Sequence, residues 1–318
     1  MELDFSDFFA TLRSIKRVLV IGIGGGGDVA GTIPTANFLR GIGVSEVLHG
    51  SLIWERVDVG GPPAPIPHSE LKNIEIVNDT IAIVNKNSRT KSGLDFEAAR
   101  FALALDKNVI TVDITKGVVG IIRGLNDFCR KKDIQLVIGI DVGGDILTQG
   151  HEPGLISPMA DNMLLSALAN IDIPTIIGIM GPGSDGEISQ DTIMRYMGIL
   201  ARNGGYLGAI GITKKDIEEY EKVLKHMKTS SSRVSKLAAE GAEQSTVNAI
   251  KRDVKVSLLN SITFFFDTNT VYNYSPFAKL LTETKSIDDA NKIFNNHGIK
   301  TELDRAIEIY EKIQQLKK

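Results

Sequence analysis

Three loops combine glycines with acidic side chains, two residue types suited to holding a phosphate and a metal ion. The first spans residues 22–28, the second residues 141–145 and the third residues 181–187. Glycines let backbone N–H groups approach an anion closely, and carboxylate oxygens are the ligands that Mg²⁺ takes in proteins. The loops therefore predict a site for a phosphorylated small molecule, with Mg²⁺ as its cofactor.

The first loop joins an apolar run to a helical pattern and fits the GxGxxG spacing of phosphate-binding turns. Its candidate ligand-binding residues are Gly24, Gly25, Gly26, Gly27 and Asp28. A lone match to this spacing also fits a tight turn without a ligand. Because glycine is costly in conformational entropy, four in succession favour a close approach of the backbone to a ligand.

The second loop places Asp141 and Asp145 on either side of Gly143 and Gly144, directly after an apolar run. Two carboxylates so close repel each other unless a cation or hydrogen-bond donors intervene. We therefore predict that both aspartates bind metal, that the glycines contact the ligand, and that Asp145 also takes part in catalysis. Glu152, further along the chain, is a candidate general base. Helix capping by Asp145 and a solvated Glu152 are the alternatives.

The third loop repeats this chemistry with Gly181, Gly183, Asp185 and Glu187. We predict that its glycines present backbone donors to a phosphate, that Asp185 binds metal and that Glu187 acts as a general base. Capping of the following helix by Asp185 explains its position equally well.

A further helical pattern begins with Ser157 and Pro158. Serine before a proline at the first helical position predicts an ordinary N-cap. We assign Asp161, in the first turn of the same helix, to capping as well.

The elements that must position these loops alternate along the chain. Apolar, β-branched runs predict strands buried on both faces at residues 17–21, 109–113, 136–141 and 175–180. Helical periodicity is found at residues 33–42, 95–105, 117–131, 158–169 and 188–202. This alternation predicts a mostly parallel, Rossmann-like, three-layer α/β sheet. Since the carboxyl ends of parallel strands share one edge, we expect the three loops to form one site.

Two parts of the chain depart from this alternation. Residues 54–93 form an insertion with a proline-rich loop at Gly60–Pro67, able to act as a lid, and a hairpin around Asn78 and Asp79. Beyond residue 212 the pattern changes to a charged helix at 214–227, strand-like runs at 246–250, 254–259 and 262–266, and short helices. We therefore divide the chain into an α/β core of residues 1–212 and a C-terminal mixed α/β appendage of residues 213–318 packed on it.

Composition argues against several classes of protein. The 318 residues are 42% hydrophobic and 24% charged with a formal net charge of -3, and no basic stripe suggests a nucleic-acid partner. The single cysteine, Cys129, fits a reducing compartment. No signal pattern is found, and no run approaches the roughly 20 apolar residues of a membrane span. We expect a cytoplasmic protein with a small-molecule ligand and no membrane partner, for which a homo-oligomer is possible.

Several short motifs taken together resemble one family. They are residues 24–28, 54–56, 141–145, 152–154, 157–161, 181–187 and 301–304. This joint pattern resembles the domain of unknown function 1152 family of archaea and actinobacteria over nearly the whole chain. The resemblance implies a shared site without an assigned activity, and it implies that Glu302 and Asp304 fold back towards that site. Gly60–Pro67 lacks the arginine usual there in the family, which argues against an anion-binding role for this loop.

Three functions fit these residues. The leading hypothesis is a Mg²⁺-dependent enzyme acting on a phosphorylated small molecule or nucleotide. The second is an NAD(P)-linked oxidoreductase, in which Glu55 would hold the ribose hydroxyls. In that case Asp28 would repel the pyrophosphate unless a metal lay between them. The third is a non-catalytic protein that binds a nucleotide or metabolite at the same site.

Overall fold

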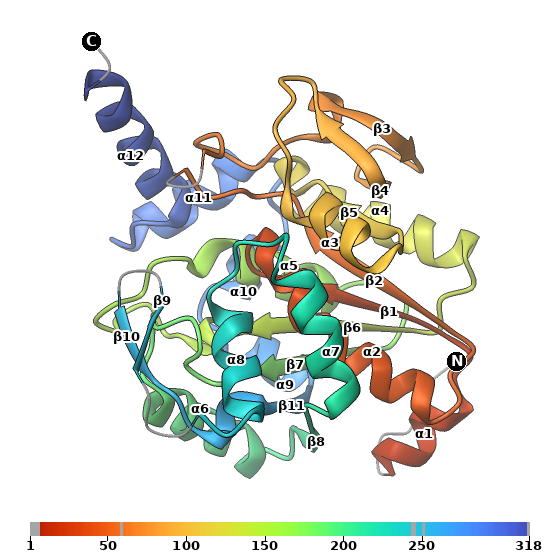
Figure 1. Ribbon diagram of the computed structural model, residues 1–318. Helices are drawn as coiled ribbons and strands as arrows, with labels where there is room; N and C mark the ends of the chain where they lie inside the picture. The colour runs from red at the N-terminus through yellow and green to blue at the C-terminus, as the bar shows by residue number, and fades with distance from the viewer. Residues whose placement is uncertain (1–6, 58–59, 243–245, 250–251, 317–318) are drawn as a thin grey trace.

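A nine-stranded sheet lies at the centre of the molecule, with helices on both of its faces (Figure 1). The computed structural model describes residues 7–57, 60–242, 246–249 and 252–316. The strands follow the spatial order β3-β4-β5-β2-β1-β6-β7-β11-β8. Their bounds are β1 (Arg17–Gly22), β2 (Glu46–Leu52), β3 (Leu71–Ile76), β4 (Ile81–Thr90), β5 (Val109–Val112), β6 (Leu136–Val142), β7 (Thr175–Met180), β8 (Tyr206–Gly211) and β11 (Ile262–Asp267).

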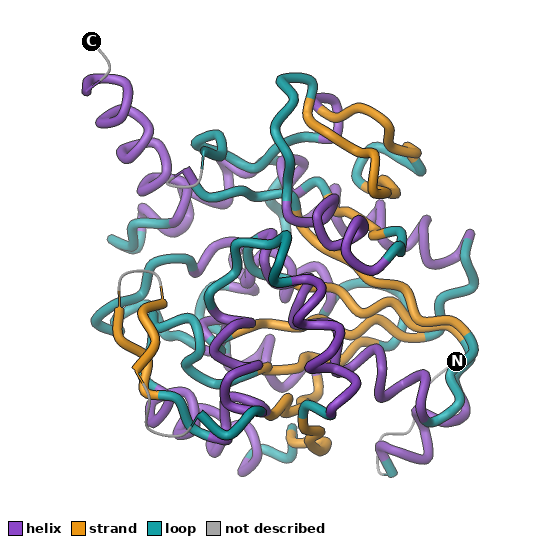
Figure 2. Tube along the Cα trace, in the orientation of Figure 1, coloured by secondary structure: helices purple, strands orange, loops and turns teal. Residues whose placement is uncertain are grey.

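A separate antiparallel pair, β9 (Thr246–Ala249) and β10 (Arg252–Lys255), stands apart from the main sheet (Figure 2). The helices are α1 (Phe8–Ser14), α2 (Thr32–Gly41), α3 (Glu97–Leu105), α4 (Gly117–Lys131), α5 (Pro158–Leu168), α6 (Gln190–Arg202), α7 (Lys214–Val223), α8 (Ser231–Ala239), α9 (Thr268–Tyr274), α10 (Ala278–Leu281), α11 (Ile287–Asn296) and α12 (Glu302–Leu316). Among the described residues, none of these helices has the length and apolar character needed to cross a membrane.

Five neighbouring strands at the centre of the sheet are parallel, in the order β5-β2-β1-β6-β7. From β1 the chain winds outward through β2 to β5, and then returns to the other side of β1 with β6 and β7. Ligands of such folds bind outside the carboxyl ends of the strands where the winding reverses, which here is between β1 and β6. The prediction of a mostly parallel, Rossmann-like α/β fold is confirmed.

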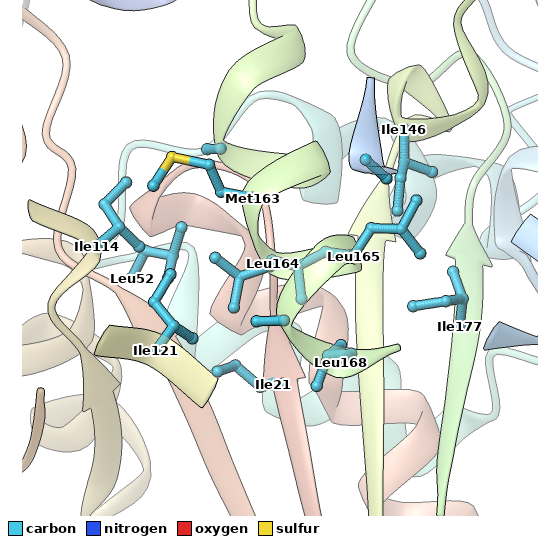
Figure 3. Packing of buried hydrophobic residues seen from close by; sticks show 14 of the residues in the cluster. Ile21, Leu52, Ile114, Ile121, Ile146, Met163, Leu164, Leu165, Leu168 and Ile177 are labelled. Atoms are coloured by element: carbon cyan, nitrogen blue, oxygen red, sulfur yellow. The ribbon is translucent and has the colours of Figure 1, made fainter. Parts of the chain in front are cut away.

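Helix α5 packs on one face of the parallel strands. Figure 3 shows Leu164 and Leu168 of this helix in the same buried cluster as Ile21 of β1 and Ile177 of β7. Every residue of α5 is buried, and so is every residue of β6. Because both faces of the central strands are covered, their sequences are continuous apolar runs rather than alternating ones. This packing fixes the first turn of α5 near the carboxyl edge of the sheet.

The strands and helices predicted for residues 17–202 agree with the structure to within two residues at their ends. The predicted hairpin is formed by β3 and β4. The Asn78 side chain shapes the turn, because its Oδ1 accepts hydrogen bonds from the N–H groups of Thr80 (3.0 Å) and Ile81 (2.8 Å).

The C-terminal part of the chain supplies a strand to the main sheet. Strand β11 lies between β7 and β8 and is antiparallel to both. Strand β8, which precedes residue 212, is therefore joined to the rest of the sheet only through a strand from the segment beyond it. The charged helix predicted at 214–227 is α7, which ends at Val223.

The predicted strand at 254–259 is wrong in its second half. Strand β10 ends at Lys255, and Leu258–Ser261 form a 3₁₀ turn. The Ser257 N–H donates to the Asn260 side chain at 2.8 Å, and a local bond of this kind competes with an extended backbone. The run predicted at 246–250 is β9, except for Ile250, which lies outside the described residues. Helix α8 begins within a serine-rich run that resembles a turn.

The position of β11 predicts that the C-terminal segment and the core unfold together. Phe265 of β11 is 1% exposed, and its ring centroid lies 5.3 Å from that of Phe8. We expect Phe265→Ala to lower the free energy of unfolding by about 3–5 kcal/mol. Urea unfolding followed by the fluorescence of Trp54, the single tryptophan, should show this loss in one transition.

The matched control is Phe9→Ala, because Phe9 is 37% exposed. This substitution should lower the free energy of unfolding much less. A Trp54 transition that stays in place in Phe265→Ala would show that the C-terminal segment folds as a separate unit.

Candidate functional site

The loops that follow β1, β6 and β7 meet at the carboxyl edge of the sheet and enclose a cleft. The loop after β1 leads through a 3₁₀ turn (Gly26–Gly31) into α2, and the loop after β6 contains a second one (Asp145–Leu147). The lining of the cleft consists of Gly24, Gly25, Gly26, Gly27, Asp28, Trp54, Glu55, Arg56, Glu97, Val142, Asp145, Ser157, Asp161, Asp185, Glu187, Lys228, Thr229 and Ser231. Residues from distant parts of the sequence thus share one site.

A first group of carboxylates, Asp28, Asp141 and Asp161, offers three oxygen atoms that lie within 4.8 Å of one another. Asp28 accepts hydrogen bonds from the N–H groups of Gly24 (3.1 Å) and Val142 (3.4 Å). Asp161 differs from its neighbours, because its Oδ1 is buried and has no hydrogen-bond partner. An oxygen in that state is a free ligand position for a cation.

A second group, Asp145, Asp185 and Glu187, also has three oxygens within 4.8 Å of one another. Some carboxylate oxygens of this group already accept hydrogen bonds from neighbouring N–H groups. Asp185 accepts from the Glu187 N–H at 3.0 Å, and Glu187 accepts from the N–H groups of Ile156 (2.7 Å) and Ser157 (3.0 Å). Glu187 therefore holds the loop that leads into α5 and also borders the cleft.

Two glycines make room for these carboxylates. A Cβ atom on Gly24 would lie 2.6 Å from Asp28 Oδ2 and 3.0 Å from Asp161 Oδ1. A Cβ atom on Gly143, where φ is +128°, would lie 2.3 Å from Asp185 Oδ2. Any side chain at either position would displace a carboxylate, so these glycines are required by the acids beside them. Gly25, by contrast, has nothing within 4 Å of its Cβ position and faces open space.

The acidic groups do not behave as ordinary surface carboxylates. Burial raises the pKa of Asp28, Asp145, Asp161 and Asp185 well above its usual value, and neighbouring carboxylates raise it further. Burial also raises the pKa of Asp141 to about 6, although backbone amides lower it. A cation that approaches these groups would favour their charged forms.

The first turn of α5 is capped from the far end of the chain. Glu302, at the start of α12, accepts hydrogen bonds from the N–H groups of Met159 (3.1 Å) and Ala160 (2.7 Å). Burial raises the pKa of Glu302 to about 7. The predicted N-cap, Ser157, makes no side-chain bond to the helix, because Glu302 occupies that position. The fold-back implied for Glu302 is therefore present, whereas Asp304 bonds to Thr301 within its own segment.

Another part of the cleft wall carries both negative and positive side chains. Glu55 Oε1 accepts a hydrogen bond from the Glu97 N–H at 3.0 Å, and burial, then the Glu97 charge, raises the pKa of Glu55 to about 7. The Lys228 N–H donates to Glu97 at 3.2 Å, which ties the segment before α8 to α3. Arg56 and Lys228 are exposed on this wall and bring two cationic side chains to the cleft.

The structure brings most of the predicted ligand-binding residues together. Those that line the cleft are Gly24, Gly25, Gly26, Gly27, Asp28, Glu55, Asp145, Asp185 and Glu187. Asp141 lies among them without lining the cleft, because its carboxylate turns back to the N–H groups of Gly144 (3.4 Å) and Ile146 (3.2 Å).

The other predicted residues lie outside the lining. Gly144, Gly181 and Gly183 have positive φ angles and shape turns of the second and third loops, as Gly143 does. Glu152 accepts from the N–H groups of Gln149 (2.7 Å) and Gly150 (2.9 Å), and the Tyr196 hydroxyl donates to it at 2.6 Å. It therefore holds its own turn rather than facing the acidic groups.

Sequence reasoning missed Asp161 as a site residue. The helix capping predicted for it is not seen, since its Oδ1 has no partner and its carboxylate belongs to the first group. It also missed Glu97 as part of the cleft. The sequence offers one signal for these residues. Asp161 is an acidic residue in the first turn of a helix that follows a glycine-rich segment.

Comparison with known proteins gives one match. The model of the family described as "Protein of unknown function (DUF1152)" matches residues 19–310. No curated protein and no solved structure matches the chain. The matched range includes all three loops, both acidic groups and Glu302, so the whole candidate site lies within it.

The raised pKa values predict how one buried acid affects stability. A carboxyl group whose pKa is higher in the folded than in the unfolded chain keeps its proton after the unfolded chain has lost it, so the free energy of unfolding falls as pH rises. For Asp141 this interval runs from 3.8 to about 6, and for Glu302 from 4.5 to about 7. Asp161 belongs to the same class.

In chelator, we expect Asp161→Asn to raise the melting temperature relative to wild type, and to raise it more at pH 8 than at pH 5. The comparison between variants is needed because buried His49, whose pKa burial lowers, titrates in the opposite sense. Asp172→Asn, at an exposed aspartate, is the control and should change little. A destabilised Asp161→Asn at both pH values would indicate a structural hydrogen-bonding role instead.

Proposed function

The chain belongs to the DUF1152 family, and we propose that it is a Mg²⁺-dependent enzyme that acts on a phosphorylated small molecule in the cleft between β1 and β6. The observation that carries this proposal is the buried Oδ1 of Asp161, which has no hydrogen-bond partner and lies with oxygens of Asp28 and Asp141 inside a 4.8 Å group. A buried carboxylate without a partner is costly, and a divalent cation removes that cost.

The donor set suits Mg²⁺. All three ligands are hard carboxylate oxygens, and Mg²⁺ is usually held by one or two carboxylates together with water and substrate phosphate. The residues of the first group would hold the ion, and Asp145 with Asp185 would face it from the second group. A bound Mg²⁺ would neutralise charge on a phosphate and so favour attack at phosphorus.

Asp145 is the residue that we propose as the proton acceptor. Its carboxylate lines the cleft, and burial raises its pKa well above the usual value, so it can take a proton at a higher pH than an exposed aspartate. The Ser157 hydroxyl oxygen lies 3.3 Å from it, while the single proton of that hydroxyl is donated to Glu187, which makes the shorter contact. In this proposal Glu187 positions the loop before α5, since three donors of residues 156–157 already bond to it.

The other two hypotheses have weaker support. An NAD(P)-linked reaction would use the remaining oxygen of Glu55 to hold ribose hydroxyls, since the Glu97 N–H engages only Oε1. It also needs a site for the pyrophosphate beside Asp28, which the acidic groups oppose unless a cation is bound. A non-catalytic binding protein would use the same residues, and only turnover of a bound compound distinguishes it from an enzyme.

Calorimetric titration with MgCl₂ tests the proposal directly. We expect saturable binding with release of protons, because the raised pKa values leave protons on the carboxyl groups that a metal must displace. Asp161→Asn should weaken the affinity by about tenfold or more, since it removes a ligand oxygen. Asp172→Asn is again the control and should bind like wild type.

Turnover is then sought by incubating the Mg²⁺-loaded protein with pooled phosphorylated metabolites and measuring released phosphate and new products. Loss of this activity in chelator is the expected result. Absence of saturable Mg²⁺ binding, or equal affinity in Asp161→Asn, would refute the metal site. Binding of both metal and metabolite without any product would support the non-catalytic alternative.

A further inference from the structure

The side chains of the cleft restrict the class of compound that it can bind. Of the residues that line it, only Trp54 and Val142 have apolar side chains, and both are more than nine-tenths buried. Trp54 belongs to the hydrophobic core beneath the cleft. Pockets for nucleotides and dinucleotides normally bury the base against apolar or aromatic surface, where stacking supplies a large part of the affinity. In the described part of this cleft, Trp54 and Val142 expose too little of their side chains to offer a base a stacking surface.

The polar lining divides into an acidic and a basic part. The two carboxylate groups form the acidic part, and the basic part consists of Arg56 and Lys228 with the neighbouring Thr229 and Ser231. The Arg56 side chain makes no hydrogen bond or ion pair with any described residue, although its charge acts on Asp28. A guanidinium that is free, exposed and directed at a cleft is suited to binding a phosphate.

Backbone donors reinforce the basic part. Helix α8 begins at Ser231, and its N-cap, Ser230, makes no side-chain hydrogen bond to the first turn. The segment before it packs on the glycine loop, because a Cβ atom on Gly27 would lie 3.1 Å from the Thr229 Cβ. The start of this helix and the glycine loop therefore both border the cleft, and the N-terminal end of the helix favours an anion there. Asp161, whose Oδ1 has no hydrogen-bond partner, lines the same cleft and offers a position for a cation.

Glu55 provides an acceptor beside the basic part. It is 4% exposed and lines the cleft, and the Glu97 N–H engages only its Oε1 at 3.0 Å. Carboxylates that border a polar cleft bind hydroxyl groups by accepting their hydrogen bonds. A ligand with a phosphate at one end and hydroxyls along its length would match Arg56, Lys228 and Glu55 together.

We infer that the ligand of this cleft is a small polyhydroxylated phosphate, a sugar or polyol phosphate, and not a nucleotide. The phosphate would lie between the cation held by the first carboxylate group and the basic part formed by Arg56 and Lys228. The hydroxyls would donate to Glu55. This inference rests on the proposed function and narrows it to one class of substrate.

Two of the probes for the test differ in whether they carry a nucleotide base. Ribose 5-phosphate and AMP share the ribose phosphate, and only AMP carries a base. Each is titrated into the Mg²⁺-loaded full chain, beside glycerol 3-phosphate, hexose phosphates and inorganic phosphate. We expect at least one sugar or polyol phosphate to bind tighter than inorganic phosphate, and AMP to gain nothing over ribose 5-phosphate.

Three variants test the assigned contacts. Arg56→Ala and Lys228→Ala should each weaken binding of the sugar phosphate by about tenfold, as expected for loss of a charge-assisted hydrogen bond. Lys225→Ala removes an exposed lysine near α8 that does not line the cleft, and it should have no effect. Glu55→Gln should weaken sugar phosphates while leaving inorganic phosphate unchanged, a difference that a misfolded variant would not produce.

The outcomes distinguish failure of this inference from failure of the proposed function. AMP binding about tenfold tighter than ribose 5-phosphate would overturn the inference, because the base would then have its own site. Binding of Mg²⁺ without binding of any of these phosphates would overturn it too, while leaving the metal site intact. Failure of Mg²⁺ itself to bind would remove the proposed function and this inference together.

Discussion

Mutual repulsion among buried carboxylates is the interaction on which the candidate site depends. Seven acidic side chains converge at the carboxyl edge of the sheet: Asp28, Asp141, Asp145, Asp161, Asp185, Glu187 and Glu302. Burial withdraws them from water, and their charges act on one another at short range. An arrangement of this kind folds only if protons, hydrogen-bond donors or cations compensate the charge. Which of the three acts at each position determines what the site can do.

The fold compensates part of the charge with backbone donors. Asp28, Asp141, Asp185, Glu187 and Glu302 all accept hydrogen bonds from N–H groups of the loops or of α5. Those bonds tie the three loops to one another and to the start of α12. The same carboxylates that make the cleft acidic therefore also hold its walls in place. Asp161 lacks any such bond at one oxygen, and this imbalance makes a cation the natural partner of the first group.

The glycines of the loops have a role different from the one that their spacing indicates. A GxGxxG turn normally leaves room for a pyrophosphate, but Gly24 and Gly143 leave room for the carboxylates of Asp28, Asp161 and Asp185. The phosphate-binding role that we propose moves to the exposed Gly25, the start of α8 and two cationic side chains. The cleft thus lies where Rossmann-like folds bind their ligands, at the carboxyl edge of the sheet. Its charge distribution differs from that of a dinucleotide site.

The sequence by itself determined most of the alternation of strands and helices up to residue 202, although it did not predict β2, and it indicated a candidate site at one sheet edge. Apolar runs and helical periodicity are local properties, and parallel strands bring their carboxyl ends together whatever the details. The same reasoning predicted a role for Asp141, Asp145 and Asp185, which the structure places in the two carboxylate groups. Only the tertiary structure decided that Asp161 is an unpartnered member of the acidic group, since its apparent capping role was taken by Glu302 from more than a hundred residues away. It likewise decided that β11 completes the main sheet and that the 228–231 segment borders the cleft. Those contacts join residues far apart in the chain, and their energies depend on burial and charge that no local pattern encodes.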